Sequence, residues 1–333
     1  MATSTSQSCR ARIPQVLRFG FSLRAMLLIT AVTALVPGYV AIRLRERRAA
    51  RTVVECGGIV RYDWQSEEGD YDGRTLPLFR SENPTGPGWL RAAIGDDWFQ
   101  HVERVSLFND KTTDRAVACL SDFPRLRKLY LRGARLSDTG LEHLGRLKQL
   151  ESFDLEGANV TDDGIERLKG LHSLEALVLS RTRISNDALK SFSYLSRLSI
   201  LSLDNTLVGD EGLRHLENLM SLESLSLCQT RVTDLGLRHL AALTHLRELA
   251  LCENRRITDD GMKNLKGLKS LRSLHLDNTR LTDKGLKYLQ DMADLEYLSA
   301  INTGVTADGV KALKLALPKV RLTTPRPRSS ARL

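Results

Sequence analysis

The chain has 333 residues, of which 42% are hydrophobic, 5% aromatic and 27% charged. This composition is that of a folded protein and excludes a disordered or collagen-like chain. The five cysteines form no C-x-x-C pair, which excludes a disulfide-dense scaffold and a cysteine-based zinc module.

The net charge of +9 belongs to the two ends of the chain. Residues 1–61 hold ten arginines against two acids, and residues 320–333 hold four arginines and no acid, so the body between them carries −3. Because the body has no basic excess, we expect no nucleic-acid partner. We interpret residues 1–24 as a basic N-terminal tail.

Residues 25–42 form an uncharged, mostly apolar stretch with arginines on both sides. As a helix the stretch would be about 27 Å long, enough to cross a bilayer core. We therefore predict one membrane-spanning helix at 25–42, in a membrane that we expect to be the inner or cytoplasmic one. The basic residues on its two sides leave the orientation undecided. The alternatives are a signal peptide cleaved near Val32 and Ala34, and a buried core helix.

We interpret residues 43–101 as a juxtamembrane linker and the N-terminal cap of a repeat domain. The ends of stacked repeats expose core and need a cover. Apolar side chains for this cover come from Trp89, Leu90, Trp98 and Phe99. Residues 68–73 partly resemble a calcium loop, but the first and twelfth positions do not fit, so we predict a solvated acidic loop there.

A repeat of 24 residues dominates the rest of the chain. Its eight units, of which the sixth is one residue longer, begin at Leu126, Leu150, Leu174, Leu198, Leu222, Leu246, Leu271 and Leu295. Positions are numbered here from these leucines. The common pattern is L-x-x-L-x-L-x-x-T-x-[LIV]-[ST]-D-x-G-L-x-x-L-x-x-L, in which the first half predicts a short strand and the second a short helix with one apolar face.

One unit cannot bury its own leucines, whereas stacked units can. The sequence therefore predicts an α/β solenoid over residues 102–322, with a curved parallel sheet inside and short helices outside. We expect a degenerate first strand within residues 101–109, a last strand within 317–322 and a disordered basic tail at 323–333. The serine or threonine and the aspartate at positions 12 and 13 predict helix N-caps, and the threonine at position 9 predicts a bond from its hydroxyl to the backbone.

These residues resemble the leucine-rich-repeat family, and the T-x-[IV]-T-D-x-G-L half is similar to its cysteine-containing subtype. Position 9 departs from that subtype, because it carries Ala, Thr or Asn in place of Cys. The order of basic tail, membrane segment, C-G-G-I-V-R-Y-D at 56–63 and the W-L-R to G-D-D-W-F stretch at 89–99 resembles single-pass, membrane-anchored repeat proteins of planctomycete-type bacteria. This resemblance implies an architecture. No F-box precedes the repeats, so no ubiquitin-ligase role is implied.

Positions 3, 5 and 7 of each unit are expected to face the inner surface of the sheet. We predict that a protein or peptide partner binds there. The candidate partner-binding residues are Lys128, Tyr130, Arg132, Asp154, Glu156, His275, Asp277 and Tyr297. The resulting hypothesis is a non-enzymatic, membrane-anchored protein-interaction module, and the alternative is a structural or self-associating component of the cell envelope. No nucleotide-binding, hydrolase or metalloprotease motif occurs, and we expect no catalytic residue, metal or cofactor.

Three further groups of residues have a structural and a functional interpretation. His143, His215 and His239 share one place in their units and are predicted to be exposed helix residues instead of metal ligands. Cys228 and Cys252 share position 7 in adjacent units and are predicted to be free thiols, because neighbouring parallel strands rarely provide disulfide geometry. The arginines at position 10 are predicted to pair with nearby acids, with an anion-binding strip as the alternative.

Overall fold

The computed structural model describes residues 23–62, 101–108 and 112–324, with the side chains of 23–36 left out. It divides into two compact units, residues 1–44 and 45–333. The predicted cap residues from Trp89 to Phe99, the acidic loop and the end of the basic tail from residue 325 lie outside the described residues.

The first helix, α1 (Leu23–Glu55), contains the whole predicted segment 25–42 and continues well beyond it. It stops where Gly57 adopts a left-handed φ of 78°, and the amides of Gly57 and Gly58 close the last turn by donating to the carbonyls of Val54 and Val53 at 2.9 Å. Among the described residues, no helix combines the length and the apolar composition that crossing a membrane requires. Residues 25–36 of the predicted segment lie outside the residues whose side chains are described.

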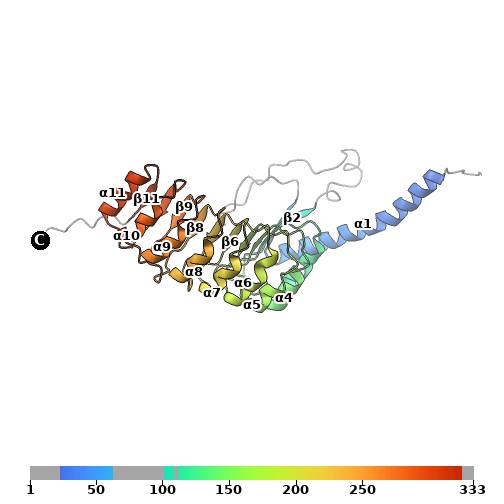
Figure 1. Cartoon of the computed structure of the whole chain (residues 1–333). Helices are drawn as coiled ribbons and strands as arrows, with labels where there is room; N and C mark the ends of the chain where they lie inside the picture. The colour runs from blue at the N-terminus through green and yellow to red at the C-terminus, as the bar shows by residue number, and fades with distance from the viewer. Residues whose placement is uncertain (1–22, 63–100, 109–111, 325–333) are drawn as a thin grey trace, which may run out of the picture. The chain divides into compact units, whose positions relative to one another are not determined.

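One sheet of 11 strands runs through the second unit, with the strands in the order of the sequence (Figure 1). Only β1 and β2 pair antiparallel; every later neighbour is parallel. The strands are β1 (Ile59–Tyr62), β2 (Val102–Ser106), β3 (Lys128–Tyr130), β4 (Ser152–Asp154), β5 (Ala176–Val178), β6 (Ile200–Ser202), β7 (Ser224–Ser226), β8 (Glu248–Ala250), β9 (Ser273–His275), β10 (Tyr297–Ser299) and β11 (Arg321–Thr323).

Short helices follow the strands and form a second layer on one side of the sheet (Figure 1). The α-helices are α3 (Asp114–Ala118), α4 (Asp138–Leu144), α5 (Asp162–Glu166), α6 (Asn186–Lys190), α7 (Asp210–Leu213), α8 (Asp234–Leu237), α9 (Asp259–Leu265), α10 (Asp283–Leu286) and α11 (Ala307–Ala316). The 3₁₀ turns are η2 (Cys119–Asp122), η3 (Ser191–Tyr194), η4 (Arg214–Leu216), η5 (Arg238–Leu240) and η6 (Lys287–Leu289). The predicted solenoid of strands and helices is thus confirmed.

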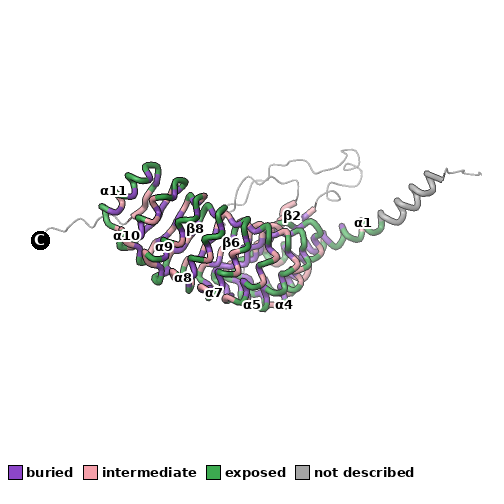
Figure 2. The backbone as a smooth tube through the Cα atoms, viewed as in Figure 1, coloured by how far each residue is buried: buried purple, intermediate pink, exposed green. Residues whose placement is uncertain are grey.

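The core lies between the two layers, and buried residues recur in every repeat (Figure 2). Positions 4 and 6 are buried in all eight units, because alternate residues of a strand face opposite sides of the sheet. Ala49 and Val53, from the end of α1, belong to the same buried cluster as Val102 and Val105 of β2. The end of α1 therefore covers the first strand of the repeats.

A left-handed residue stands at position 8 of all eight units, with φ between 53° and 70°. Only the first two units have glycine there, Gly133 and Gly157. The turn directs the amide of position 8 to the carbonyl of position 7 in the next unit, as in Gly133 to Glu156 at 2.7 Å. The predicted threonine bond is confirmed: the hydroxyl of Thr206, for example, donates to the carbonyl of Leu203 at 2.7 Å.

The acidic residues at the starts of the helices form a row of hydrogen bonds between units, which we call the Asp ladder. Each accepts from the backbone amide at position 12 of the following unit, at 2.7 to 3.2 Å, and all but Asn186 also accept from the hydroxyl there. Its members are Asp114, Asp138, Asp162, Asn186, Asp210, Asp234, Asp259 and Asp283. The prediction that these carboxylates cap their own helices was wrong, because they bond to the next unit.

The same ladder explains the glycine at position 15. A Cβ atom on Gly212 would lie 2.7 Å from the Oδ1 atom of Asn186, the ladder residue of the preceding unit. In the six other units that have glycine there, the ladder oxygen lies even closer to the place of that Cβ atom. The third unit has Ala188 at this position and keeps its ladder bonds from Ser185 to Asp162. In the glycine units, a side chain would displace the group that joins two units.

Candidate protein-interaction surface

The residues at positions 3, 5 and 7 form an outward-facing surface of the sheet, which we call the strand face. The buried leucines at positions 4 and 6 turn the intervening side chains away from the core. The strands pair in register, so that Tyr130 lies next to Asp154 and Tyr297 next to Ser273. Equivalent positions therefore form continuous rows along the repeats.

The first candidate cluster lies on β3, β4 and the turns that follow them. The Nε atom of Arg132 donates to Asp154 at 2.6 Å, and Glu156 is 3.7 Å from the same nitrogen. The hydrogen bond with Asp154 raises the pKa of Arg132 more than its partial burial lowers it. On the neighbouring strand the guanidinium of Arg104 lies 5.8 Å from the centre of the Tyr130 ring, a cation–π distance.

Asp154 is buried, whereas the sequence predicts that it faces a partner on the surface. Its side chain is 3% exposed, whereas that of Arg132 is 54% exposed. The carboxylate also accepts the amide of Glu156 at 2.9 Å. Asp154 therefore positions Arg132 and the turn, and its burial leaves it no surface for direct contact with a partner.

The second candidate cluster lies on β9 and β10. The rings of His275 and Tyr297 are 5.2 Å apart at an angle of 51°, within the range of packed aromatic pairs. Ser273 lies 3.0 Å from Nε2 of His275, and the hydroxyl of Tyr297 lies 3.1 Å from Thr323 of β11. These contacts hold both rings on the strand face.

Asp277, also predicted to bind a partner, is engaged in a similar way to Asp154. Its Oδ1 atom accepts from the hydroxyl of Ser299 and the amide of Ile301, each at 2.6 Å. Asp204 makes the same pair of bonds to Ser226 and Cys228. An aspartate at position 7 therefore fixes the turn of the next unit.

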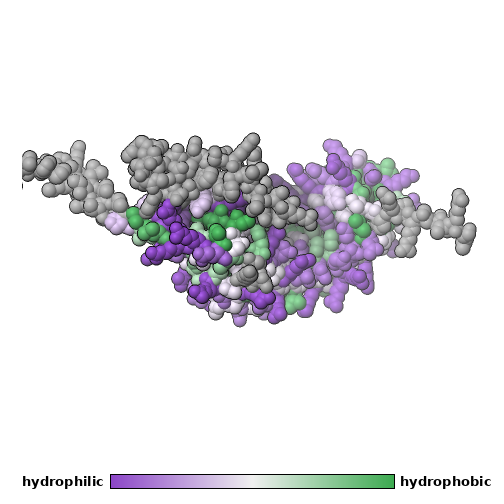
Figure 3. All heavy atoms as spheres, turned by 180° about the vertical axis from the view of Figure 1, so that it is seen from behind, coloured by the Kyte–Doolittle hydropathy of each residue, from purple (hydrophilic) through white to green (hydrophobic). Residues whose placement is uncertain are grey.

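The strands between the two clusters carry small side chains. Ser180 and Ser202 bond to each other at 2.7 Å, and Ile200 is 46% exposed. Five strand steps separate β4 from β9, which is about 24 Å at ~4.8 Å per step. The space-filling view from behind shows hydrophilic side chains over most of the visible surface and apolar ones in small patches (Figure 3). The structure thus presents two separate clusters on a broad polar face.

Sequence reasoning missed Arg104 and Thr323, which contribute to these clusters from outside the eight units. The register places Arg104 next to Lys128, and Thr323 next to Ser299. Extending the alternation of the repeat into the flanking strands would have found both.

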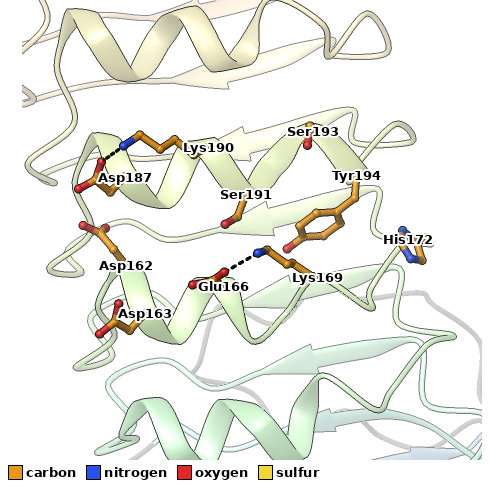
Figure 4. Close-up of a pocket in the computed structure, with 10 residues that line it drawn as sticks. All are labelled: Asp162, Asp163, Glu166, Lys169, His172, Asp187, Lys190, Ser191, Ser193 and Tyr194. Carbon is orange, nitrogen blue, oxygen red and sulfur yellow. Dashed lines mark hydrogen bonds and ion pairs between the residues drawn. The ribbon is translucent and has the colours of Figure 1, made fainter.

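A depression of about 620 Å³ lies on the helical side of the repeats, between α5 and the α6–η3 segment (Figure 4). Its lysines, Lys169 and Lys190, pair with Glu166 and Asp187. Tyr194 packs edge-on against His172 at 5.8 Å, and burial raises the pKa of Tyr194. None of the predicted site residues lies here. Both lysines of the depression are therefore paired within their own units, whereas its other two carboxylates, Asp162 and Asp163, form no ion pair within the described residues.

Three of the arginines at position 10 do not pair as predicted. Arg183, Arg231 and Arg280 are exposed, and within the described part of the chain none of the three forms an ion pair. Their side chains are too far from the Asp ladder, whose carboxylates are already engaged with serine and threonine. The pairing prediction was therefore wrong for these three residues.

His143, His215 and His239, which the sequence predicts to be exposed, are all half-buried. His239 bonds to Glu217 at 2.5 Å. Within residues 23–62, 101–108 and 112–324, no three or more His, Cys, Asp or Glu side chains are grouped to hold a metal ion. Cys56, Cys119, Cys228 and Cys252 are free thiols, as predicted for the last two.

The fold and the strand face together define a repeat solenoid that presents a long surface to solvent. The family described as "Leucine-rich repeat region" matches residues 101–315. The chain therefore belongs to the leucine-rich-repeat family. Such domains are commonly protein-interaction modules and are typically non-enzymatic.

Solved structures of similar proteins have low sequence identity to this chain. A leucine-rich-repeat protein of Leptospira interrogans is 21% identical with a TM-score of 0.48, and the alignment covers 63% of this chain and 57% of that one. Two internalins of Listeria monocytogenes are 19% and 21% identical, with TM-scores of 0.45 and 0.43. They align over 64% and 67% of this chain and 71% and 81% of their own. No curated protein matches the chain. The alignment with the Leptospira protein spans little more than half of that protein's length.

Proposed function

We propose that this protein is a non-enzymatic, membrane-anchored module that binds a protein or peptide partner through its strand face. The observation that carries the proposal is the pair of clusters at the two ends of that face. Tyr130 and Arg132 form one, and His275 and Tyr297 form the other. Tyrosine and arginine are enriched among the residues that dominate binding energy.

The way these side chains are held supports the same function. Arg132 is half exposed but is bonded to a buried carboxylate, and Tyr297 is tied to Thr323 while packed on His275. Side chains that are already ordered lose less conformational entropy when a partner arrives. Because the clusters are about 24 Å apart, the partner is an extended peptide or a broad protein surface.

The anchor is part of the proposal. Residues 25–42 are uncharged and have basic flanks, and they lie in one continuous helix with residues up to Glu55. We propose that they cross the inner or cytoplasmic membrane once, as in the planctomycete-type repeat proteins that the sequence resembles. The T-D-x-G-L segments favour a relation to the cysteine-containing subtype, from which position 9 departs by carrying Ala, Thr or Asn in place of Cys.

Site-specific crosslinking in cells tests the partner and the face together. A photo-crosslinking residue would replace Tyr130 or Tyr297 on the strand face, and Tyr288 of η6 on the helical side as the matched control. We expect one common product from the two strand-face positions and none from Tyr288. A product that contains only a second copy of the chain would favour the self-associating alternative.

The identified partner is then measured against full-length variants in detergent. Replacing Tyr130, Arg132, His275 and Tyr297 together by Ala is expected to weaken binding at least about 100-fold. This is a loss of ~2.8 kcal/mol, because each factor of ten in Kd corresponds to ~1.4 kcal/mol. Tyr288→Ala is expected to leave the affinity unchanged. Equal affinities of the fourfold variant and the unmodified protein would refute the assignment to the strand face.

A further inference from the structure

Two cysteines occupy adjacent places in one row of the strand face. Cys228 and Cys252 both stand at position 7, in the fifth and sixth units. The strands that precede them pair in register, with Ser226 next to Ala250. The amides of Leu227 and Gln229 donate to the carbonyls of Ala250 and Cys252 at 2.8 Å. The backbone thus holds the two cysteines directly opposite each other.

Both cysteines are half-buried, so each keeps part of its surface in contact with solvent. Both are free thiols. Because the strands pair in register here, the two side chains leave the same face of the sheet from adjacent positions of one row.

The row continues with an aspartate on each side of the pair. Asp204 accepts from the amide of Cys228 at 2.7 Å, and the thiol of Cys252 donates to Asp277 at 3.7 Å. Both carboxylates are fixed by serine hydroxyls of the next unit. Their charges attract a cation, although their remaining bonds keep them engaged with the turns.

Geometry restricts what the pair can hold. In-register parallel strands lie about 4.8 Å apart, whereas a disulfide needs Cβ atoms about 3.8 Å apart, so direct closure would distort the sheet. An ion with metal–sulfur bonds of about 2.3 Å would span two sulfurs about 4.6 Å apart. Zinc requires four ligands. Within the described residues, no three His, Cys, Asp or Glu side chains are grouped so that they could hold a metal ion.

We propose that Cys228 and Cys252 form a two-thiolate site for a soft monovalent metal ion, Cu(I). Soft thiolate ligands favour Cu(I), zinc and iron–sulfur clusters, and the last two are held by four ligands, whereas this pair supplies two. Two thiols and one Cu⁺ give one Cu(SR)₂⁻ group and two protons, with no change in the oxidation state of copper or sulfur. The site lies between the two candidate partner-binding clusters and does not depend on either of them.

The experiment is a competition for Cu(I) between the reduced full-length protein in detergent and the chromophoric chelator bicinchoninate, without oxygen. A variant with Cys9, Cys56 and Cys119 replaced by Ser keeps only the pair. We expect it to take one equivalent of Cu(I) from the chelator. Further replacement of Cys228 or Cys252 by Ser is expected to weaken binding at least 100-fold. Thermal unfolding followed by circular dichroism shows that each variant is folded.

Two measurements distinguish thiolate binding from binding by other donors. Because ligation releases thiol protons, the affinity is expected to rise at least about tenfold per pH unit near neutrality. Zn²⁺ is expected to bind far more weakly than Cu(I). The site would be overturned if the pair-only variant left the copper on the chelator, or if Cys228→Ser kept its affinity. A flat pH profile or an equal affinity for Zn²⁺ would also overturn it.

Discussion

The Asp ladder and the strand face both extend along the repeats, and they differ in regularity. The ladder makes the same amide bond in eight successive units, and adds the same hydroxyl bond in all but the one with Asn186. On the strand face no two units present the same three side chains. The ladder positions are therefore fixed by the task of stacking the units. Most strand-face positions are not, although aspartates such as Asp277 also bond to the next unit.

The largest expected effect tests whether the ladder carries stability. Asp234→Ala leaves the amide and hydroxyl of Thr258 without the acceptor that now lies 2.8 and 2.6 Å away. We expect the free energy of unfolding to fall by about 2 kcal/mol, since an unsatisfied buried donor costs about 1–3 kcal/mol and the two donors of Thr258 are partly buried. Urea denaturation of the full-length protein in detergent measures the loss.

The matched control is Asp260→Ala, in the helix that follows. The side chain of Asp260 is 75% exposed and pairs only with Lys263, so its removal is expected to cost less than about 1 kcal/mol. Equal losses at Asp234 and Asp260 would show that the ladder is not a structural element.

A smaller effect is expected on the strand face, where Arg132 and Asp154 are coupled. A double-mutant cycle of Arg132→Ala and Asp154→Asn is expected to give about 1 kcal/mol of coupling, reduced from the ~1.5–3 kcal/mol of a charged hydrogen bond because Arg132 is half exposed. The exposed pair Arg247–Glu223, at 3.1 Å, is the control and should give about 0.5 kcal/mol or less. Coupling of the same size in both pairs would remove the positioning role of Asp154.

The smallest effect concerns the left-handed turn at position 8, between the strand face and the helices. Arg181 has a φ of 59°, where glycine is less strained. Arg181→Gly is expected to stabilise the protein by about 0.5 kcal/mol, after the entropy of the added glycine is subtracted. Gly157→Ala, at the same position one unit earlier, should destabilise it by about 1 kcal/mol. Melting temperatures of the two variants and the unmodified protein show whether each change stabilises or destabilises. A lower melting temperature for Arg181→Gly would contradict the strain argument.

The strands and turns of the repeats could be predicted because the residue pattern within each 24-residue unit determines its local structure. Alternation around Leu129 or Leu201 predicts a strand, and the threonine of position 9 has its acceptor three residues away. Both features depend on residues close in sequence, so a pattern within one unit is sufficient to find them.

Features that join residues of different units could not be predicted in the same way. Asp234 and Thr258 are a whole unit apart, and the helix-capping role assigned to such aspartates was the local solution to the same pattern. The burial of Asp154 beneath Arg132 also depends on how two turns stack. Apolarity stops at Ile42 and bounds only the predicted membrane segment, whereas the helix continues until Gly57 permits a left-handed turn.

The ladder bond always runs from one unit to the next, so each unit accepts from one neighbour and donates to the other. Removal of one full period, residues 198–221, would bring Asn186 to the amide of Thr233 in place of that of Gly209. The new junction would keep its register and gain a hydroxyl donor. The length of this protein is therefore a variable that whole-unit duplication or loss can change without redesign of the joints.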